Sequence, residues 1–400
     1  MMGPRKQSAS RIDLLFFAED PGAANYISPL PYGVSREGLS CLVLAEGKAV
    51  DRFTADALPY LRPEDFGDAR AILEKTRPRI IVVGTSENEK SLGLSLLDAA
   101  REAGIRSIGV VDAFMNAAHR FRGRGSEPLR HAPDWLFVPD TWTAQAFVDL
   151  GFPGERTVVC GHPQYDHVRM ASEHLRGVDR TALRERFFLG LQQDRPVCLF
   201  AAEISDGLQP EQFLRSNDYS LHGRGDSDRR TDIVLEEWLD AISLLPETPQ
   251  IALRLHPKND PAEFAPYLSA FRWVSREEPV LELVYASDSV FGLTTSLLLE
   301  AAILGVPTFS IVPREAERLW LPSVRAGITP CATTREELRT LLPDFLRGLG
   351  EARKRPDPQL FPFGSIRRAV QSLRKVLCFQ SVSGAPIASM DDKNVHSGKH

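Results

Sequence analysis

The segment ASDSVFGLTTSLLLEAAILGVP (residues 286–307) contains the pattern that decides the fold. A short apolar run ends at a hydroxyl-rich turn, a helical stretch follows, and a Gly-x-Pro turn opens the next apolar run. Strands that alternate with helices of about ten to fifteen residues indicate βαβ units and a parallel sheet. The segment therefore predicts an α/β protein with doubly wound sheets.

The same alternation extends through the chain in two series. Compact apolar runs that suit buried parallel strands occur first at 12–20, 41–47, 79–85, 105–113, 134–140 and 156–163, and then at 195–203, 250–257, 271–275, 289–295 and 306–313. Helical patterns separate them, one at 261–271 among them, and close the chain at 334–349 and 365–377. Two series in 400 residues predict two Rossmann-like domains that face each other across a cleft.

We expect an N-terminal domain at 1–170 and a C-terminal domain at 171–379. The small, polar residues of 380–400 predict a disordered tail. Residues 204–231 lack periodicity and predict a long loop that can act as a lid.

Composition excludes several classes of protein. Lys and Arg number 48 against 53 Asp and Glu, a net charge of −5 that argues against a nucleic-acid binder. Five scattered cysteines without a CxxC pair argue against disulfides and zinc, so we expect a cytoplasmic protein. No segment is apolar enough to span a membrane, although peripheral contact with a membrane stays compatible with the sequence.

Polar residues that follow a strand are the candidates for a site, because ligands of such sheets bind at the carboxyl ends of strands. Thr294, Thr295 and Ser296 open a helix whose free N–H groups and dipole favour an anion such as a phosphate. Glu300 lies one turn further on, where it can take the hydroxyls of a ribose. A hydroxyl N-cap with an exposed acid explains the same residues.

A second candidate group is Arg254, His256 and Lys258, at the end of the strand at 250–257. Pro257 stops the strand, and a histidine between two cations can donate to a phosphate or a leaving group at neutral pH. A structural histidine bonded to the backbone is the alternative.

A third group follows the first strand. Glu19 or Asp20 can act as general base, while Gly22 and its small neighbours let a ligand approach the backbone as far as Asn25. An Asp-Pro-Gly turn that leads into a helix explains the composition equally well. The segment is neither a GxGxxG fingerprint nor a P-loop.

A fourth group lies after the strand at 105–113. Asp112 ends this strand, and Asn116 and Arg120 follow within two helical turns, so that all three can line the same cleft. Glu203, after the strand at 195–203, can border it from the other domain. An Asp N-cap and a surface Arg are the alternative. The histidines and acids show no metal-ligand spacing, and no GxSxG elbow occurs, so we expect no metal and no cofactor.

The segment at 286–307 resembles the donor-binding signature of glycosyltransferases of the two-Rossmann (GT-B) architecture and of the related UDP-N-acetylglucosamine 2-epimerases. The resemblance implies that the domain at 1–170 is on the acceptor side and that the domain at 171–379 binds a nucleotide sugar. It also implies that Glu300 holds the ribose of this nucleotide sugar. The Arg-x-His-Pro stretch that contains His256 is similar to an element of bacterial sialyltransferases and Kdo transferases, where the histidine meets the donor phosphate. Gly161-His162-Pro163 with Asp166 is similar to an interdomain element of this superfamily.

Two departures refine this expectation. Gly292 stands where retaining glycosyltransferases carry an acid, which favours an inverting reaction with Glu19, Asp20 or Asp112 as base. Residues 201–205 lack the His-Arg-x-Glu-Asn element of the epimerases. The sequence thus favours a glycosyltransferase that moves a sugar from a nucleotide-sugar donor to a glycan or protein acceptor. A nucleotide-sugar epimerase or hydrolase, and a non-catalytic binder of a glycan or partner, are the alternatives.

Overall fold

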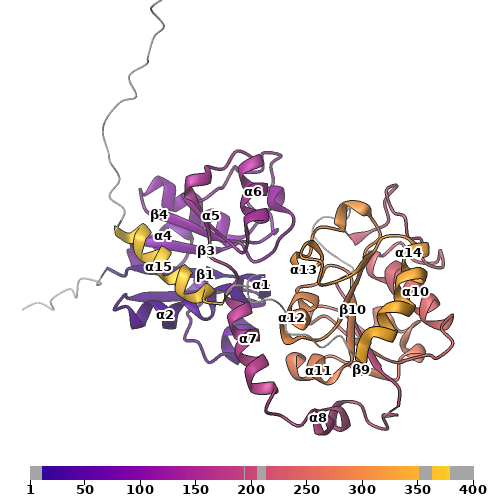
Figure 1. The fold of residues 1–400 in the computed structure, drawn as a ribbon. Coiled ribbons are helices and arrows are strands. Elements are labelled where there is room, and N and C mark those ends of the chain that lie inside the picture. The colour runs from indigo at the N-terminus through magenta and orange to yellow at the C-terminus, as the bar shows by residue number, and fades with distance from the viewer. Residues whose placement is uncertain (1–10, 193, 205–212, 351–362, 379–400) are drawn as a thin grey trace, which may run out of the picture.

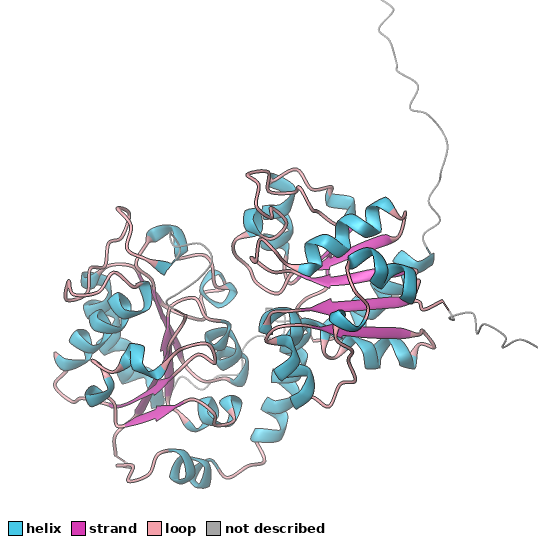
Figure 2. Ribbon diagram, turned by 180° about the vertical axis from the view of Figure 1, so that it is seen from behind, coloured by secondary structure: helices cyan, strands magenta, loops and turns pink. Residues whose placement is uncertain are grey.

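The computed structural model describes residues 11–192, 194–204, 213–350 and 363–378. The expected tail at 380–400 and positions 205–212 of the expected lid lie outside these described residues. The described residues form two lobes, each a parallel sheet covered by helices on both faces (Figures 1 and 2). This arrangement confirms the two-domain α/β fold expected from the alternation of apolar runs and helical patterns.

The N-terminal lobe contains a six-stranded parallel sheet with strand order β2-β1-β3-β4-β5-β6. Its strands are β1 (Leu14–Ala18), β2 (Cys41–Ala45), β3 (Ile80–Gly84), β4 (Arg106–Val110), β5 (Trp135–Val138) and β6 (Thr157–Val159). The helices between them are α1 (Pro21–Ile27), α2 (Leu30–Arg36), α3 (Ala49–Ala55), α4 (Ala69–Thr76), α5 (Leu92–Glu102) and α6 (Thr141–Asp149). All side chains of β1 and β3 are buried, as expected for strands covered on both faces.

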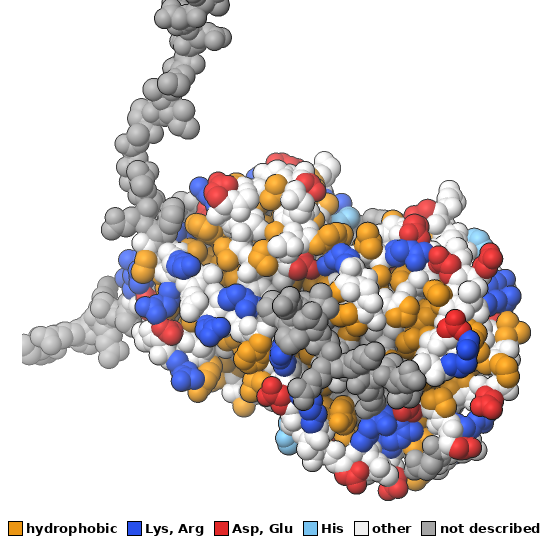
Figure 3. Space-filling view, in the orientation of Figure 1, with side chains coloured by type: hydrophobic (Ala, Val, Ile, Leu, Met, Phe, Trp, Pro, Cys, Tyr) orange, Lys and Arg blue, Asp and Glu red, His pale blue; other side chains and the backbone are white. Residues whose placement is uncertain are grey.

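The C-terminal lobe repeats this plan with strand order β12-β11-β10-β7-β8-β9. Its strands are β7 (Val197–Ala201), β8 (Gln250–Arg254), β9 (Trp273–Ser275), β10 (Ser289–Gly292), β11 (Thr308–Ile311) and β12 (Cys331–Ala332). Its helices are α10 (Arg230–Ser243), α11 (Val280–Ala286), α12 (Ser296–Leu304), α13 (Pro322–Arg325) and α14 (Arg335–Arg347). Both lobes expose acidic and basic side chains on the face seen in Figure 3.

The helix expected at 261–271 is not continuous. Two short 3₁₀ turns, Pro261–Phe264 and Leu268–Ala270, take its place. Pro266 lies between them, and a proline has no N–H to donate and disfavours helical geometry at the preceding residue. The α-helix therefore does not extend across this segment.

The chain crosses between the lobes twice. Helices α7 (Pro163–Leu175) and α8 (Arg180–Phe187) lead from the first lobe to the second, and α15 (Ser365–Cys378) returns to the first. The apolar face of α15, which includes Ala369, Leu373 and Val376, packs into the core beneath β1 and β3. The expected C-terminal domain at 171–379 thus ends in a helix that belongs to the N-terminal core.

Asp166 holds the start of α15 against the first lobe. Its carboxylate accepts hydrogen bonds of 2.9 Å from the N–H groups of Gly364 and Ile366, at the start of α15. Gly161 lies beside the same turn with φ of +79°, and a Cβ atom there would come within 2.4 Å of the Ser365 hydroxyl. The Gly-x-Pro-x-x-Asp stretch thus joins the crossover helix to the last helix.

Replacement of Asp166 by Ala leaves two amide donors at a buried helix start without their acceptor. We expect the free energy of unfolding of the N-terminal lobe to fall by about 2–4 kcal/mol, measured by urea denaturation followed by circular dichroism. Asp179→Ala is the matched control, because Asp179 caps the exposed start of α8 through Thr181 and should cost about 1 kcal/mol. Equal losses in the two variants would contradict the structural role of Asp166.

Candidate functional site

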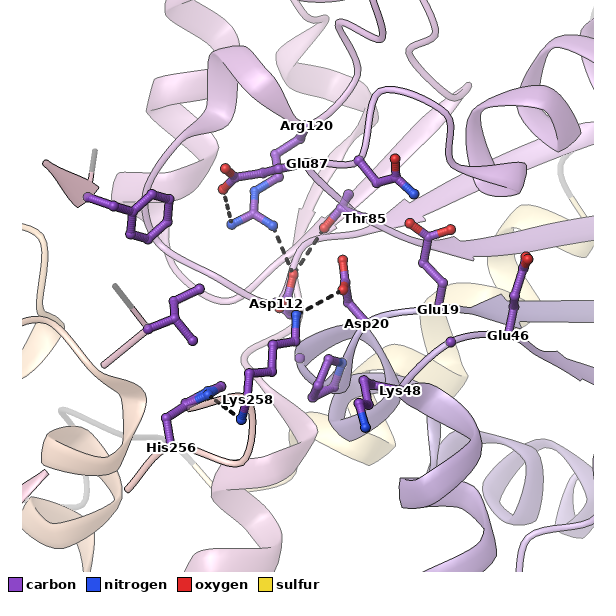
Figure 4. A pocket seen from close by; sticks show the side chains of 16 residues that line it. Glu19, Asp20, Glu46, Lys48, Thr85, Glu87, Asp112, Arg120, His256 and Lys258 are labelled. Atoms are coloured by element: carbon purple, nitrogen blue, oxygen red, sulfur yellow. Dashed lines mark hydrogen bonds and ion pairs between the residues drawn. The ribbon is translucent and has the colours of Figure 1, made fainter. Parts of the chain in front are cut away.

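A cavity of about 810 Å³ lies between the lobes, where the carboxyl ends of the strands face each other. Its walls come from loops that follow β1, β2, β3 and β4 on one side and β7 and β8 on the other (Figure 4). The lining residues are Glu19, Asp20, Pro21, Gly22, Glu46, Gly47, Lys48, Thr85, Glu87, Asn88, Asp112, Arg120, Ile204, Phe213, His256 and Lys258. A cavity of this size between two domains is suited to a small-molecule ligand.

Asp20 connects the two sides of the cavity. One carboxylate oxygen accepts a hydrogen bond of 2.6 Å from the Ser86 hydroxyl, and the other lies 3.5 Å from the ammonium of Lys258 in the opposite lobe. Both side chains of this ion pair are about one-third exposed, at 36% and 37%, so that a ligand can reach them. The pair therefore places a carboxylate and a cation from different lobes on the same volume.

Asp112 is more deeply placed than Asp20. It accepts hydrogen bonds from Thr85 at 3.1 Å and from the guanidinium of Arg120 at 3.5 Å. Burial raises the pKa of this carboxyl above its usual value, and the charge of Arg120 opposes the increase. Gly22 packs directly on Asp112, since a Cβ atom at position 22 would lie 1.8 Å from the carboxylate oxygen Oδ2.

Glu19 lies beside Asp20 but points into a different environment. Its carboxylate accepts a 2.9 Å hydrogen bond from Ser91, the residue that caps α5. Burial raises the pKa of Glu19, an effect that hydrogen bonds from Ser86 and Ser91 oppose. Of the three expected bases, Asp20 is thus the one that faces a cation of the other lobe.

His256 lines the cavity from the C-terminal lobe. Its Nδ1 accepts a 3.1 Å hydrogen bond from the backbone N–H of Lys258, so the neutral ring carries its proton on Nε2. Burial, assisted by the charges of Lys258 and Arg254, lowers the pKa of His256 to about 4. The imidazole is therefore a neutral hydrogen-bond donor at pH 7, and Lys258 supplies the positive charge.

Glu203 lies beneath the cavity in a buried ionic network. Its carboxylate accepts hydrogen bonds from the Thr294 N–H at 2.5 Å and from Arg230 at 2.6 Å. Arg230 also pairs with Glu317, which in turn binds Arg314. Glu203 and Thr294 thus contact each other, and the Thr294 N–H that we expected to meet a phosphate donates to a carboxylate of the chain itself.

Several expected site residues lie outside the cavity lining. Arg254 donates to the Ser275 hydroxyl at 2.7 Å and to the Glu278 carbonyl at 3.1 Å, so its guanidinium is directed toward β9. Glu300 is 8% exposed and accepts a 3.4 Å hydrogen bond from Gln164 of α7, and burial raises its pKa to about 7. The others that do not line the cavity are Asn25, Asn116, Glu203, Thr294, Thr295 and Ser296.

Two of these residues have a structural contact that the structure defines. Thr295 is the N-cap of α12 and accepts from the Leu297 N–H, as its hydroxyl predicts. Asn116 donates to the carboxylate of Glu87 at 3.0 Å, and Glu87 itself lies 3.5 Å from Arg120. Arg120 is therefore held between Glu87 and Asp112.

The sequence analysis did not single out Glu46, Lys48, Glu87, Asn88 or Phe213. Glu46 and Lys48 directly follow β2, and Glu87 and Asn88 follow β3, at positions where the rule about strand ends applies equally. That rule would have found four of the five. Phe213 gave no such signal, because it lies in a long segment without a periodic pattern.

Among the described residues, no group of three or more His, Cys, Asp or Glu side chains has an arrangement that could hold a metal ion. Among the same residues, no helix combines the length and apolar character needed to cross a membrane.

The fold is a two-domain, GT-B-like α/β fold. It is similar to UDP-GlcNAc 2-epimerase from Neisseria meningitidis, solved with bound UDP-GlcNAc, at a TM-score of 0.63 and 14% identity over 91% of this chain and 100% of that chain. A glycosyltransferase from Rickettsia africae matches at a TM-score of 0.60 and 10% identity, over 92% and 99% of the two chains. An Anabaena protein in complex with UDP-glucose matches at 0.59 and 12%, over 92% and 100%.

At these identities the similarity establishes the fold, which is shared with enzymes that process nucleotide sugars. No protein-family model and no curated protein sequence matches this chain. The similar solved structures confirm the expected GT-B-like architecture. The role of the His-Pro element remains a prediction.

The contact between Gly22 and Asp112 can be tested by adding one methyl group. Gly22→Ala places a Cβ atom against the Asp112 carboxylate, and such overpacking costs about 1–3 kcal/mol. We expect a lower melting temperature by calorimetry. Gly348→Ala is the control, since a Cβ atom there meets nothing within 4 Å. A Gly22→Ala protein as stable as this control would contradict the close packing.

Buried neutral histidines predict a loss of stability in acid. Burial lowers the pKa of His162 to about 3 and that of His256 to about 4, against an ordinary value near 6.5. Below pH 6.5 both histidines take up a proton in the unfolded chain but stay neutral in the folded chain. The free energy of unfolding should therefore fall from pH 6.5 toward about 4. His162→Asn retains an N-cap acceptor for Gln164 and should flatten this dependence in urea titrations; an unchanged slope would argue against it.

Proposed function

We propose that the chain is a metal-independent, inverting glycosyltransferase that moves a sugar from a nucleotide-sugar donor to a surface-glycan or protein acceptor. The observation that carries the proposal is the pair of Asp20 and Lys258, a carboxylate and a cation from opposite lobes 3.5 Å apart in one cavity. Transfer to an acceptor hydroxyl requires such a pair, a base on the acceptor side and a positive charge on the phosphate side.

On the donor side, Lys258 and the Nε2–H of His256 bind the phosphates of the nucleotide. As the bond from the anomeric carbon to phosphate breaks, negative charge develops on the phosphate oxygen, and both groups stabilise it. The first turn of α12, at Thr295 and Ser296, lies at the end of β10, which is separated from β8 only by β7. A nucleotide can therefore extend along this sheet edge from His256 toward α12.

The resemblance assigns the ribose to Glu300. In the structure one oxygen of this carboxylate accepts a 3.4 Å hydrogen bond from Gln164, and its second oxygen can accept from a ribose hydroxyl. A metal ion is not part of the proposal, because the sequence lacks the paired-acid spacing of metal-dependent transferases and Lys258 supplies positive charge at the phosphate position.

On the acceptor side, Asp20 removes the proton of the acceptor hydroxyl as this oxygen attacks the anomeric carbon. Ser86 fixes one oxygen of Asp20 and leaves the other directed into the cavity. Asp112 has a raised pKa and is covered by Gly22, so we assign it, with Arg120, to shaping the cavity wall. A single displacement of this kind inverts the configuration at the anomeric carbon. A cytoplasmic location, where nucleotide sugars are made, is part of the same proposal.

A nucleotide-sugar epimerase or hydrolase is the second candidate. It is favoured by the similar structures, several of which are UDP-GlcNAc 2-epimerases. The cavity also holds carboxylates near one another, Glu19, Asp20 and Asp112, as acid–base chemistry on a sugar ring requires. Turnover of a nucleotide sugar without an acceptor distinguishes this candidate from the transferase, and ligand binding without turnover would indicate a non-catalytic binder.

Binding of UDP, GDP, CDP, CMP and dTDP should be compared by thermal shift. A ligand at a hundredfold excess over its Kd stabilises the native state by about 2.7 kcal/mol, which raises the melting temperature by several degrees. We expect one nucleotide to stabilise the protein selectively and the shift in melting temperature to be lost in Lys258→Ala.

The variant Asp20→Asn tests the base. It should keep the shift in melting temperature but lose turnover by about a hundredfold or more. The control Asp149→Asn, on the outer side of α6, should keep both the shift and the turnover.

Three outcomes contradict the proposal. If no nucleotide stabilises the protein, the donor site is wrong. If Asp20→Asn turns over as fast as the wild type, Asp20 is not the base. If the sugar nucleotide is epimerised or hydrolysed without an acceptor at the rate seen with one, the epimerase candidate replaces the transferase.

A further inference from the structure

A groove of about 500 Å³ lies on the outside of the N-terminal lobe, between α2, α7 and α15 and away from the cavity that holds Asp20. Two large apolar side chains that line it are strongly exposed, Met170 of α7 at 60% and Phe363, before α15, at 55%. Tyr32 of α2, exposed at 70%, lies beside the groove under Arg36. Isolated exposed apolar residues are ordinary, but three from separate parts of the chain around one groove form a patch. Each belongs to a segment whose other face is packed in the protein.

The same surface is basic. Arg36 and Arg367 line the groove, and Arg374 follows Arg367 by two helical turns on the exposed stripe of α15. Arg36 lies over the ring of Tyr32 and Arg169 over that of Phe363, both at 5.8 Å, so the cations are placed beside the apolar groups. We call this surface the basic aromatic face; it comprises Tyr32, Arg36, Arg169, Met170, Phe363, Arg367 and Arg374.

Three acidic side chains lie on or beside this face in the described part of the chain. Glu37 is exposed and pairs with Arg374, and Glu173 is exposed one helical turn after Met170. Asp166 is buried and accepts the two amides at the start of α15. Among the described residues, the face thus has four arginines against two exposed carboxylates, on a chain whose net charge is −5. Figure 3 shows Lys and Arg side chains among apolar ones over the part of the N-terminal lobe where α2 and α15 lie. The local excess of cations does not follow from overall composition.

We propose that the basic aromatic face binds the surface of an anionic phospholipid bilayer. Arginines attract anionic headgroups, each by about 1 kcal/mol near the surface, and the arginine stems, Tyr32, Met170 and Phe363 enter the boundary between headgroups and acyl chains. Tyr32 is suited to this boundary because its ring is apolar and its hydroxyl is polar. The inference does not depend on the proposed transferase reaction, because its residues lie outside the catalytic cavity.

The test is sedimentation of the full chain with vesicles of phosphatidylcholine alone and of phosphatidylcholine with 30 mol% phosphatidylglycerol. The composition, about one anionic lipid in three, gives a strongly negative surface potential. We expect binding to the anionic vesicles only, with a loss as NaCl rises from about 50 mM to about 500 mM, since salt screens surface charges. The double variant Arg36→Glu/Arg367→Glu should bind at least about tenfold more weakly.

The matched control is Arg276→Glu/Arg339→Glu. It makes the same change of charge at two exposed arginines of the C-terminal lobe and should bind as the wild type does. Tyr32→Ser/Met170→Ser keeps every charge and should weaken binding severalfold, which distinguishes apolar insertion from charge attraction alone. Because all substituted side chains are exposed, unchanged melting temperatures should accompany these effects.

The proposal is overturned if the wild type binds neutral and anionic vesicles equally, or if the control variant loses as much binding as the double variant. Equal binding to a short DNA duplex would show a general attraction for polyanions and would also overturn it. A concentration-dependent dimer that Arg36→Glu/Arg367→Glu disrupts, without vesicle binding, would assign the face to a second copy of the chain instead.

Discussion

Parallel pairing of the strands is the constraint on which the rest of this structure depends. In a parallel sheet every strand runs in one direction, so the loops that follow the strands gather at one edge. In the N-terminal lobe this edge carries Asp20, Lys48, Glu87 and Asp112, which are far apart in sequence and share one cavity. The second sheet contributes His256 and Lys258 by the same rule. The site is thus a consequence of topology before it is a consequence of any single motif.

Polar contacts join the lobes at several points, and Phe114 of the N-terminal lobe packs in an apolar cluster of the C-terminal lobe. Asp20 meets Lys258 across the cavity, and Arg325 of the C-terminal lobe reaches Asp140 at 2.5 Å while it lies 4.5 Å from the ring centre of Trp142. Such contacts are weak enough to open and directional enough to define a closed arrangement. The return of α15 to the first lobe adds a covalent limit, because the chain crosses between the lobes a second time. The proposed transferase reaction, in which a substrate must enter and water must then be excluded, is compatible with this combination.

Buried charge in the C-terminal lobe is balanced within the chain. Arg230 and Arg314 offset Glu203 and Glu317, and the Thr294 N–H joins the network. The network gives each charged group a partner, and burial of these charges without partners would cost free energy. The Thr294 contact also fixes the turn before α12. The same network corrects the expectation that Thr294 is free for a phosphate. On the outer surface, by contrast, Arg36 of α2 lies over the exposed ring of Tyr32, and Arg374 of α15 pairs with the exposed Glu37.

The periodicity of apolar residues and the turn residues are local properties of the chain. They were sufficient to predict the α/β class, the two sheets and the loops that carry Glu19, Asp20, Asp112 and His256. The sequence did not predict that one carboxylate oxygen of Asp20 faces the ammonium of Lys258 in the other lobe. That Arg254 is directed to Ser275 and Glu278, that Glu300 meets Gln164, and that α15 completes the first core depends on contacts between residues far apart in the chain. A helical pattern at 365–377 specifies an apolar stripe but not the sheet that covers it. The sheet that this stripe covers is known from the tertiary structure, in which Asp166 binds the start of α15 and the helix packs on the first lobe.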